Sequence, residues 1–280
     1  MKNLLLSLFL LSLCMTFIDS AYAQPSNDPY EILKGRVTYI SSYHAFGKNP
    51  TTPITYEVVS SNGFYRTPQV ADSIQLRIKA GSANDTALGT GAREITITGL
   101  NELGNVTTES LATAGTSASA LSNTTWFRVF KITVTESGTY ANPFLTGSHA
   151  AEIILETSGG VEWTSIPFDT IGAGESQSCA YTVPSGYKAA VIDYIFSSDT
   201  DKDFQFLFTW REGVMDAAAP YKAAITIAEG DGSVGGEEHK SAIPDTLYPE
   251  LTDIIAGAKT SVSTAAISCH FEVYLTTEDL

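Results

Sequence analysis

The residues that could do chemistry in this chain are few and scattered. The histidines are His44, His149, His239 and His270. A zinc site needs several His or Cys side chains at ligand spacing, and Cys269 next to His270 is the nearest approach to one. A strand would point these two neighbours to opposite faces. No nucleophile elbow, metalloprotease helix motif or dinucleotide fingerprint occurs. We therefore expect no enzymatic activity, no catalytic residue, no cofactor and no metal.

One acidic cluster has the spacing of a cation loop. Asp199, Asp201 and Asp203 stand at alternate positions, as at the start of a calcium-binding loop. However, Phe204 occupies the place of the glycine that makes the sharp turn, and Trp210 occupies the place of the bidentate glutamate. The sequence therefore favours a solvated hairpin turn between two strands.

Two glycine-rich segments resemble binding loops. Residues 229–238 combine acidic side chains with glycines, which favours a flexible exposed loop over a metal site. In residues 81–91, Gly81, Gly89 and Gly91 suggest a phosphate cradle. A cradle ends in Lys-Ser/Thr and leads into a helix, whereas an alternating strand follows here. We interpret this segment as a surface connection.

The overall charge argues against a nucleic-acid partner. The chain has 280 residues, 16 Lys plus Arg against 31 Asp plus Glu, and a net charge of −15. A field of this sign repels phosphate backbones, and no two basic residues are adjacent. We expect no direct contact with nucleic acid.

The amino terminus has the pattern of a secretory signal peptide, residues 1–23. Lys2 gives a positive start, residues 4–18 are mainly apolar, and Ala21-Tyr22-Ala23 has the small-x-small form of a cleavage site. The apolar run is too short for a convincing membrane span. We expect no stable membrane span once this segment is removed.

Cysteine usage depends on the compartment. Cys14 would leave with the signal, so Cys179 and Cys269 would form an even pair. An oxidising compartment would favour a bridge between them, and the alternative is two buried thiols.

Alternating apolar residues predict an all-β fold. Residues 73–79 and 93–100 show period two, and similar segments recur at about ten-residue spacing with polar or glycine-rich turns, as in sandwiches. The predicted strands are residues 52–59, 73–79, 93–100, 106–112, 126–135, 151–157, 161–167, 176–183, 188–197, 203–210, 222–228 and 265–277. Two segments, 29–35 and 247–259, compete as helices.

The domain organisation follows from composition. Residues 24–68 contain five prolines and several aromatics, which predicts an extended N-terminal arm that crosses onto a neighbouring subunit. A glycine pair near residue 159 separates two antiparallel β-sandwich or jelly-roll-like units, domain 1 at 69–158 and domain 2 at 159–280. Exposed sheet edges and an arm favour a homo-oligomer.

Several segments resemble, in order, a family of virion structural proteins of tailed bacteriophages, many of them marine. They are DPYEILKGRV at 28–37, YHAFGKNP at 43–50, SANDTALGTGAREITITGL at 82–100, WFRVFKI at 126–132 and IGAGESQSCAYTVPSG at 171–186. The loop and strand at 82–100 are the most specific match. The resemblance covers residues 28–213.

The resemblance implies a non-enzymatic virion building block, of the capsid-decoration or head-fibre type. Its partners would be further copies of itself, as a homotrimer, and other virion proteins. Its location would be the virion, and both cysteines would stay reduced. The export signal departs from the family, because phage heads assemble in the host cytoplasm. Either translation starts further downstream, with Met15 as an internal alternative, or this relative is exported. The alternative is a secreted or periplasmic bacterial β-sandwich adhesin or glycan-binding protein, supported by the signal and by Tyr39, Tyr43 and Phe64 as exposed aromatics.

Overall fold

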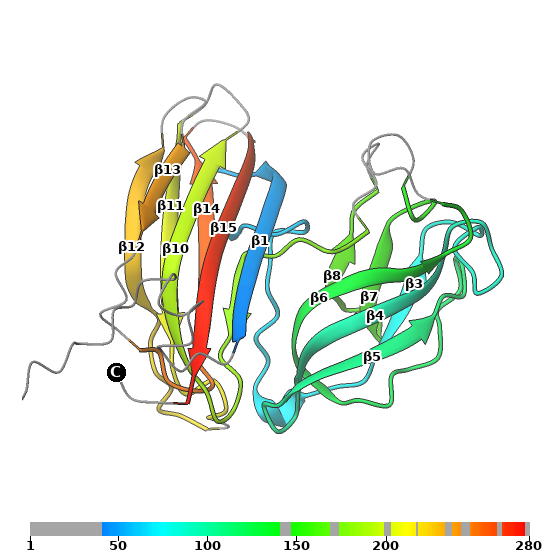
Figure 1. Ribbon diagram of the computed structural model, residues 1–280, viewed down its shortest axis with the longest axis horizontal. Coiled ribbons are helices and arrows are strands. Elements are labelled where there is room, and N and C mark those ends of the chain that lie inside the picture. Colours follow the sequence, from blue (N-terminus) through cyan, green and yellow to red (C-terminus); the bar gives the residue numbers. More distant parts are fainter. Residues whose placement is uncertain are drawn as a thin grey trace, which may run out of the picture. The chain divides into compact units, whose positions relative to one another are not determined.

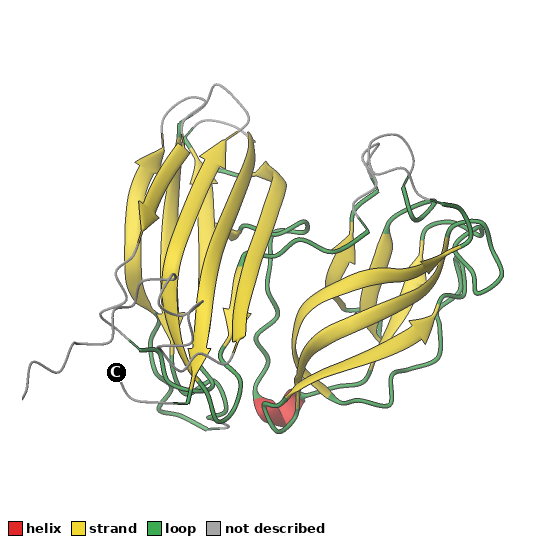
Figure 2. Cartoon of the chain, in the orientation of Figure 1, coloured by secondary structure: helices red, strands yellow, loops and turns green. Residues whose placement is uncertain are grey.

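The chain folds almost entirely into antiparallel β-structure. A computed structural model describes residues 41–140, 147–168, 174–198, 203–216, 218–232, 237–241, 247–261 and 265–277. Within these ranges the one helical element is the short 3-10 helix η1 (Val70–Asp72). All strand pairs between the named strands are antiparallel (Figures 1 and 2). The predicted all-β fold is confirmed.

The first pair of sheets, which we call sandwich I, takes strands from both ends of the described chain. One sheet has the order β1 (Ser41–Thr52), β15 (Ala265–Thr276), β10 (Lys188–Ser198), β13 (Glu237–Ser241). The other has the order β12 (Ile225–Gly232), β11 (Phe204–Arg211), β14 (Asp253–Thr260), β2 (Glu57–Val58), and β9 (Ala180–Thr182) also pairs with β14. Phe196 on β10 stacks on Phe206 of β11, which joins the sheets through a common core.

The second pair of sheets, sandwich II, is built from the middle of the chain. One sheet has the order β3 (Leu76–Ala80), β7 (Ile153–Thr157), β8 (Glu162–Ile166), and the other has the order β5 (Val106–Ala112), β4 (Ala92–Asn101), β6 (Trp126–Ser137). Ile78, Ile97, Trp126 and Leu155 belong to one buried cluster between them. Because β1 and β2 precede these strands and β9 to β15 follow, sandwich II is an insertion in sandwich I.

Period-two patterning explains these strands. Along β15 buried and half-buried residues alternate without interruption, so that every second side chain enters the core. Burying the rings and branched side chains of these strands contributes about 1.5–3 kcal/mol each relative to exposure.

Two sequence-based expectations are wrong. Residues 247–259 are no helix, because 253–260 form β14, whose Ile254, Ala256 and Ala258 are buried at alternate positions. The acidic glycine-rich segment 229–238 is no flexible loop where it is described, because it contributes to β12 and β13. Glycine is needed at two positions of β12. A Cβ on Gly230 would lie 2.7 Å from the Phe206 ring, and a Cβ on Gly232 would lie 2.1 Å from the Phe204 ring.

Part of the predicted arm is built into sandwich I. Residues 41–52 form β1, which pairs with β15 of the same chain, so this stretch does not cross onto a neighbour. The earlier part of the arm, the signal-like segment 1–23 and the competing helix at 29–35 lie outside the described residues. β8 follows the proposed boundary near residue 159 but pairs with β7, before it. The bounds 24–68, 69–158 and 159–280 stay predictions.

Within the described ranges, no helix has both the length and the apolar character that crossing a membrane requires.

Candidate functional site

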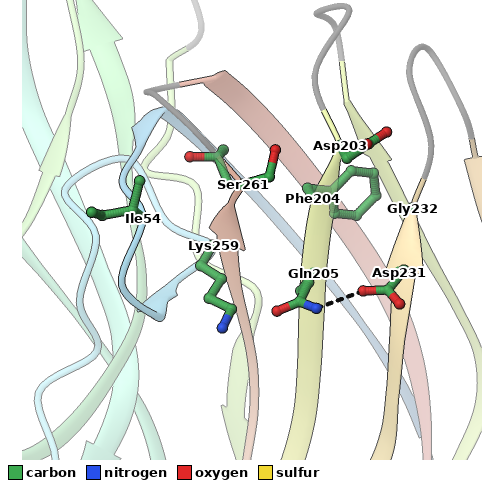
Figure 3. Close-up of a pocket in the computed structure, with 9 residues that line it drawn as sticks. Ile54, Asp203, Phe204, Gln205, Asp231, Gly232, Lys259 and Ser261 are labelled. Atoms are coloured by element: carbon green, nitrogen blue, oxygen red, sulfur yellow. Dashed lines mark hydrogen bonds between the residues drawn. The ribbon is translucent and has the colours of Figure 1, made fainter.

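An open pocket of about 600 Å³ lies at one end of the β12–β11–β14 sheet. It is lined by Ile54, Asp203, Phe204, Gln205, Asp231, Gly232, Lys259, Thr260 and Ser261 (Figure 3). Its volume is in the range of small-molecule sites. We call it the sheet-end pocket.

Three polar side chains of this pocket form a row across adjacent strands. Gln205 on β11 is opposite Lys259 on β14 and opposite Asp231 on β12. Residues in register on neighbouring strands point to the same face, and Phe204, one position earlier, points into the core. The Gln205 amide donates a hydrogen bond of 2.7 Å to the Asp231 carboxylate (Figure 3). The register of three strands therefore places an ammonium, an amide and a carboxylate side by side.

Backbone hydrogen bonds fix the rim of the pocket. The Thr260 amide donates to the Pro53 carbonyl at 2.8 Å, and the Thr260 hydroxyl donates to the Thr52 carbonyl at 3.3 Å. These bonds hold the turn that presents Ile54, which is 62% exposed. The Ser261 amide donates to the Asp203 carbonyl at 3.1 Å, so the end of β14 and the start of β11 are joined.

Tyr56 lies beside the pocket. The Lys259 ammonium lies 4.7 Å from the centroid of the Tyr56 ring, within the range of a cation–π contact. The pKa of the Tyr56 hydroxyl is raised, first by burial and then by the negative charges of Glu229 and Asp231. The surroundings of the pocket are therefore mainly acidic, with one cation.

The structure describes only part of the calcium-like acidic cluster. Asp199 and Asp201 lie outside the described residues, whereas Asp203 lines the sheet-end pocket. Among the described residues, no group of three or more His, Cys, Asp or Glu side chains could hold a metal ion. Sequence reasoning did not single out Gln205, Asp231 or Lys259 as a group, since nothing in the sequence reveals the register that brings them together.

The aromatics proposed for an adhesin are not a single exposed platform. Tyr43 stacks on Tyr181 with ring centroids 4.3 Å apart, and burial raises the pKa of its hydroxyl well above the usual range. Phe64 is half-buried and lies under the guanidinium of Arg66 at 4.3 Å. Tyr39 lies outside the described residues.

The loop at 82–91 is organised around the buried carboxylate of Asp85. Its Oδ1 accepts hydrogen bonds from the Ala92 and Ala150 amides, both at 2.8 Å, and its Oδ2 accepts one from the Ala151 amide at 3.2 Å. A Cβ on Gly91 would lie 2.1 Å from this Oδ1. The glycine therefore serves internal packing.

Arg128 in the WFRVFKI segment is a buried joint between the two sandwiches. Residues 40 to 280 form one compact unit. Arg128 on β6 donates to both carboxylate oxygens of Asp253 on β14, at 3.1 and 3.3 Å, and to the Pro68 carbonyl at 2.9 Å. Asp253 also accepts from Thr182 at 2.6 Å and from Arg211 at 3.3 Å.

A small cavity of about 110 Å³ adjoins this joint and is lined in part by both guanidiniums. Arg128 and Arg211 there face Asp253, and Lys222 at the same cavity pairs with Glu212. The cations of this cavity therefore already have carboxylate partners.

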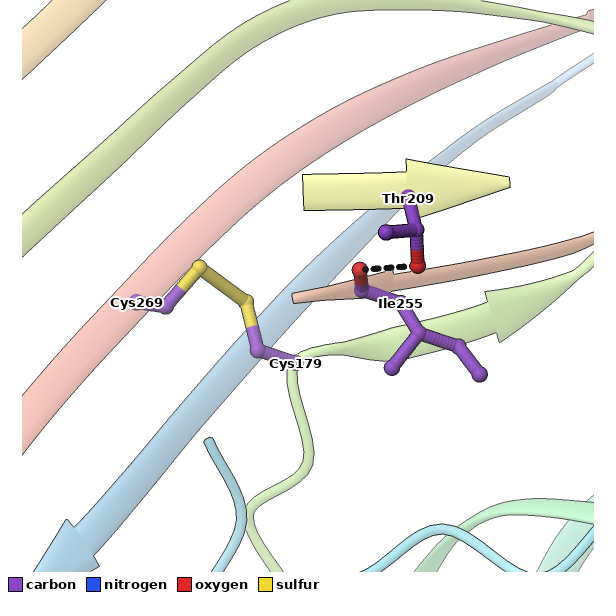
Figure 4. The surroundings of a disulfide bond; sticks show 4 residues. All are labelled: Cys179, Thr209, Ile255 and Cys269. Atoms are coloured by element: carbon purple, nitrogen blue, oxygen red, sulfur yellow. Dashed lines mark hydrogen bonds between the residues drawn. A yellow bond between two sulfur atoms is a disulfide. The ribbon is translucent and has the colours of Figure 1, made fainter. Parts of the chain in front are cut away.

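A disulfide joins Cys179 and Cys269 inside sandwich I (Figure 4). The two Cα atoms are 6.0 Å apart, within the reach of a bridge. It connects β15 of one sheet to the segment that enters β9 on the other sheet. Within that second sheet, the Thr209 hydroxyl on β11 donates a hydrogen bond to the Ile255 carbonyl on β14. The expectation of reduced thiols is wrong for this structure, because sheet pairing brings the cysteines together across the core.

Comparisons with known proteins do not place the chain in a family. No family model matches it, and no curated protein matches its sequence. The crystal structure of PirA matches at a TM-score of 0.26 and 9% identity, covering 33% of this chain and 77% of that one. The infectious bursal disease virus VP2 subviral particle matches at a TM-score of 0.20 and 11% identity, covering 86% of this chain and 73% of that one. The T=1 particle derived from the same virus matches at 0.18 and 10% identity, over 86% and 75% of the two chains.

Proposed function

We propose that this chain is a non-enzymatic structural protein of a virion, a capsid-decoration or head-fibre building block of a tailed bacteriophage. The observation that carries the proposal is that the segments with the phage-family resemblance make internal joints. The 82–100 segment closes one end of sandwich II through Asp85, and the 126–132 segment links the two sandwiches through Arg128. The described residues of these segments hold the fold together, which is the role expected in a structural building block.

The 171–186 segment, where it is described, extends this pattern. The Val134 amide donates to the Gly174 carbonyl at 2.7 Å, and the Ser176 amide donates to the Ile132 carbonyl at 2.9 Å. The segment thus runs along β6 in sandwich II and then continues through Cys179 into β9 of sandwich I. A third resembling segment therefore also connects the sandwiches.

Self-assembly into a homotrimer is part of the proposal. β5 pairs with β4 through seven residue pairs without a bulge, from Leu100 with Val106 to Glu94 with Ala112. In the described part of the chain no named strand pairs with its other edge, and β5 contains neither Lys nor Pro. A regular edge without these residues is a template for pairing with another copy.

Immunogold labelling with an antibody against the purified chain tests the location. Phage particles from lysates of the source culture should be labelled at regular positions, and uninfected cell envelopes should not. Labelled envelopes with bare particles would contradict the proposal. Light scattering on the purified chain measures its oligomeric state. A monomer at micromolar concentration would contradict the proposed homotrimer.

An exported bacterial binding protein is the second candidate, because the disulfide between Cys179 and Cys269 favours an oxidising compartment. Intact-mass measurement of natively produced protein, with and without reductant before alkylation, distinguishes the two. A chain that begins at Gln24 with a bridged pair would favour export. A longer chain with two alkylated cysteines would favour cytoplasmic assembly.

A further inference from the structure

The geometry of the sheet-end pocket points to a binding site for a neutral saccharide. We infer that Asp231, Gln205 and Lys259 hydrogen-bond the hydroxyls of a short oligosaccharide there and that Ile54 contacts its apolar face. This inference does not depend on the proposed location, because both an exported protein and a virion surface can meet glycans.

The charges of the pocket decide against charged ligands. Asp203 and Asp231 line it, and Glu229 lies close enough to affect the neighbouring Tyr56 hydroxyl, so an anion would be repelled. Lys259 lines the same pocket, so a cation would approach its ammonium as well as the carboxylates. A ligand without net charge avoids both costs.

The polar groups match a ligand that both donates and accepts hydrogen bonds. The Lys259 ammonium and the Ser261 hydroxyl can donate, and the carboxylates of Asp203 and Asp231 can accept. A sugar hydroxyl does both. A hydrogen bond is stronger when its donor or its acceptor is ionised. The ammonium and the carboxylates of this pocket therefore suit the binding of hydroxyls.

The apolar part of the site is a single exposed side chain at the rim. Ile54 is 62% exposed, and the Thr260 hydrogen bonds fix its turn. A pyranose ring presents C–H groups on one face and hydroxyls at its edge, so it can cover Ile54 while its hydroxyls reach the polar row. The size of the pocket, about 600 Å³, suits a short oligosaccharide.

The site is preformed on strands rather than on loops alone. The hydrogen bond from Gln205 orients the Asp231 carboxylate, and both side chains come from paired strands, β11 and β12. Rigid supporting elements reduce the ordering cost of binding. Binding should therefore need little rearrangement of these residues.

A printed array of neutral hexose and N-acetylhexosamine oligosaccharides, together with oligosaccharides that contain sialic or uronic acid, tests the inference on the full chain. We expect signals from neutral probes and weaker signals from acidic ones. Titration calorimetry with the strongest neutral probe then compares variants. Asp231→Asn and Lys259→Ala should each weaken binding about tenfold or more, because each removes a charge-assisted hydrogen bond.

Matched controls separate the site from general surface effects. Asp72→Asn changes an exposed residue and Lys131→Ala a half-exposed one, both away from the pocket, and they should leave the affinity within about twofold. Circular dichroism of each variant checks that the fold is intact. The inference is overturned if no neutral probe binds, if acidic probes bind better, or if the pocket variants bind as well as the controls. None of these outcomes bears on immunogold labelling of particles.

Discussion

At the scale of single residues, the buried polar groups of this chain work as internal fasteners. Asp85, Arg128 and Asp253 are each almost fully buried, and each satisfies several hydrogen-bonding groups. Burying a charge without such partners costs several kcal/mol, so these residues are tied to their positions by their neighbours. Their replacement should therefore affect stability more than surface changes do.

Asp85→Ala should lower the free energy of unfolding by about 2–4 kcal/mol, because it leaves the Ala92, Ala150 and Ala151 amides without their acceptor. Urea denaturation followed by tryptophan fluorescence measures the change. Asp72→Ala, at an exposed position, is the control and should change stability by less than about 0.5 kcal/mol. Equal effects of the two variants would contradict the role given to Asp85.

Glu109→Gln should destabilise the protein at neutral pH and have no such effect in acid. Burial raises the pKa of Glu109, but hydrogen bonds from Asn123 and Thr124 outweigh it and hold the pKa below the ordinary 4.5. A carboxylate with a lowered pKa stabilises the fold above its unfolded-state pKa, and this contribution is lost as the pH falls through the folded-state value. The melting temperatures of the wild type and of Glu109→Gln, measured between pH 7 and about pH 3, should converge at the acid end. A constant difference over this range would show that charge is not involved.

At the scale of strands, small residues decide where large ones fit. The β12 glycines leave room for the rings of Phe204 and Phe206, which enter the core from β11. The sequence displays the glycines plainly, but their purpose depends on which strand lies beside them. Without that neighbour, a glycine-rich acidic segment predicts a loop.

Gly232→Val should cost about 1–3 kcal/mol, since its side chain would overlap the Phe204 ring. Gly159→Val is the matched control, because a Cβ there meets nothing closer than 3.7 Å. Adding Phe204→Leu to Gly232→Val should recover part of the loss, which chemical denaturation can measure as a coupling energy. Independent, additive losses would argue against the contact.

Removing the disulfide through Cys179→Ala and Cys269→Ala should destabilise the oxidised protein. The bridge closes a separation of 90 residues, which corresponds to roughly 4–5 kcal/mol in the chain-entropy treatment. Reduced wild-type protein should melt close to the double variant, whereas Cys14→Ala should melt like the wild type. A wild type that melts identically with and without reductant would contradict a structural bridge.

The sequence could predict strands but not their partners. In β15, strict alternation of apolar residues identifies a half-buried strand, and the structure confirms it. In β14, short apolar residues such as Ala256 and Ala258 fit a helix as well as a strand, and pairing with β11 decides the outcome. The sheet-end pocket cannot be predicted from the sequence for the same reason, because strand register alone makes neighbours of Gln205, Asp231 and Lys259.

At the scale of the whole molecule, the joint at Arg128 couples the two sandwiches. Arg128→Ala should destabilise the protein by about 3–5 kcal/mol, because it removes the bidentate partner of the buried Asp253. The remaining Arg211 contact reduces this loss. The double variant Arg128→Met with Asp253→Leu should be less destabilised than the sum of the single variants, as denaturation would show. Limited proteolysis between the sandwiches should increase in Arg128→Ala if the joint holds them together.

Sandwich II interrupts sandwich I, and this order has a consequence for synthesis on the ribosome. β1 is made before sandwich II, but its partner β15 is the last of the strands that the structure describes. Sandwich II has all its strands as soon as β8 emerges and can fold while the chain is still growing. β1 must wait for this partner until β15 has emerged, so a nascent chain stalled before β15 would carry a finished inner sandwich and an exposed strand that chaperones can bind.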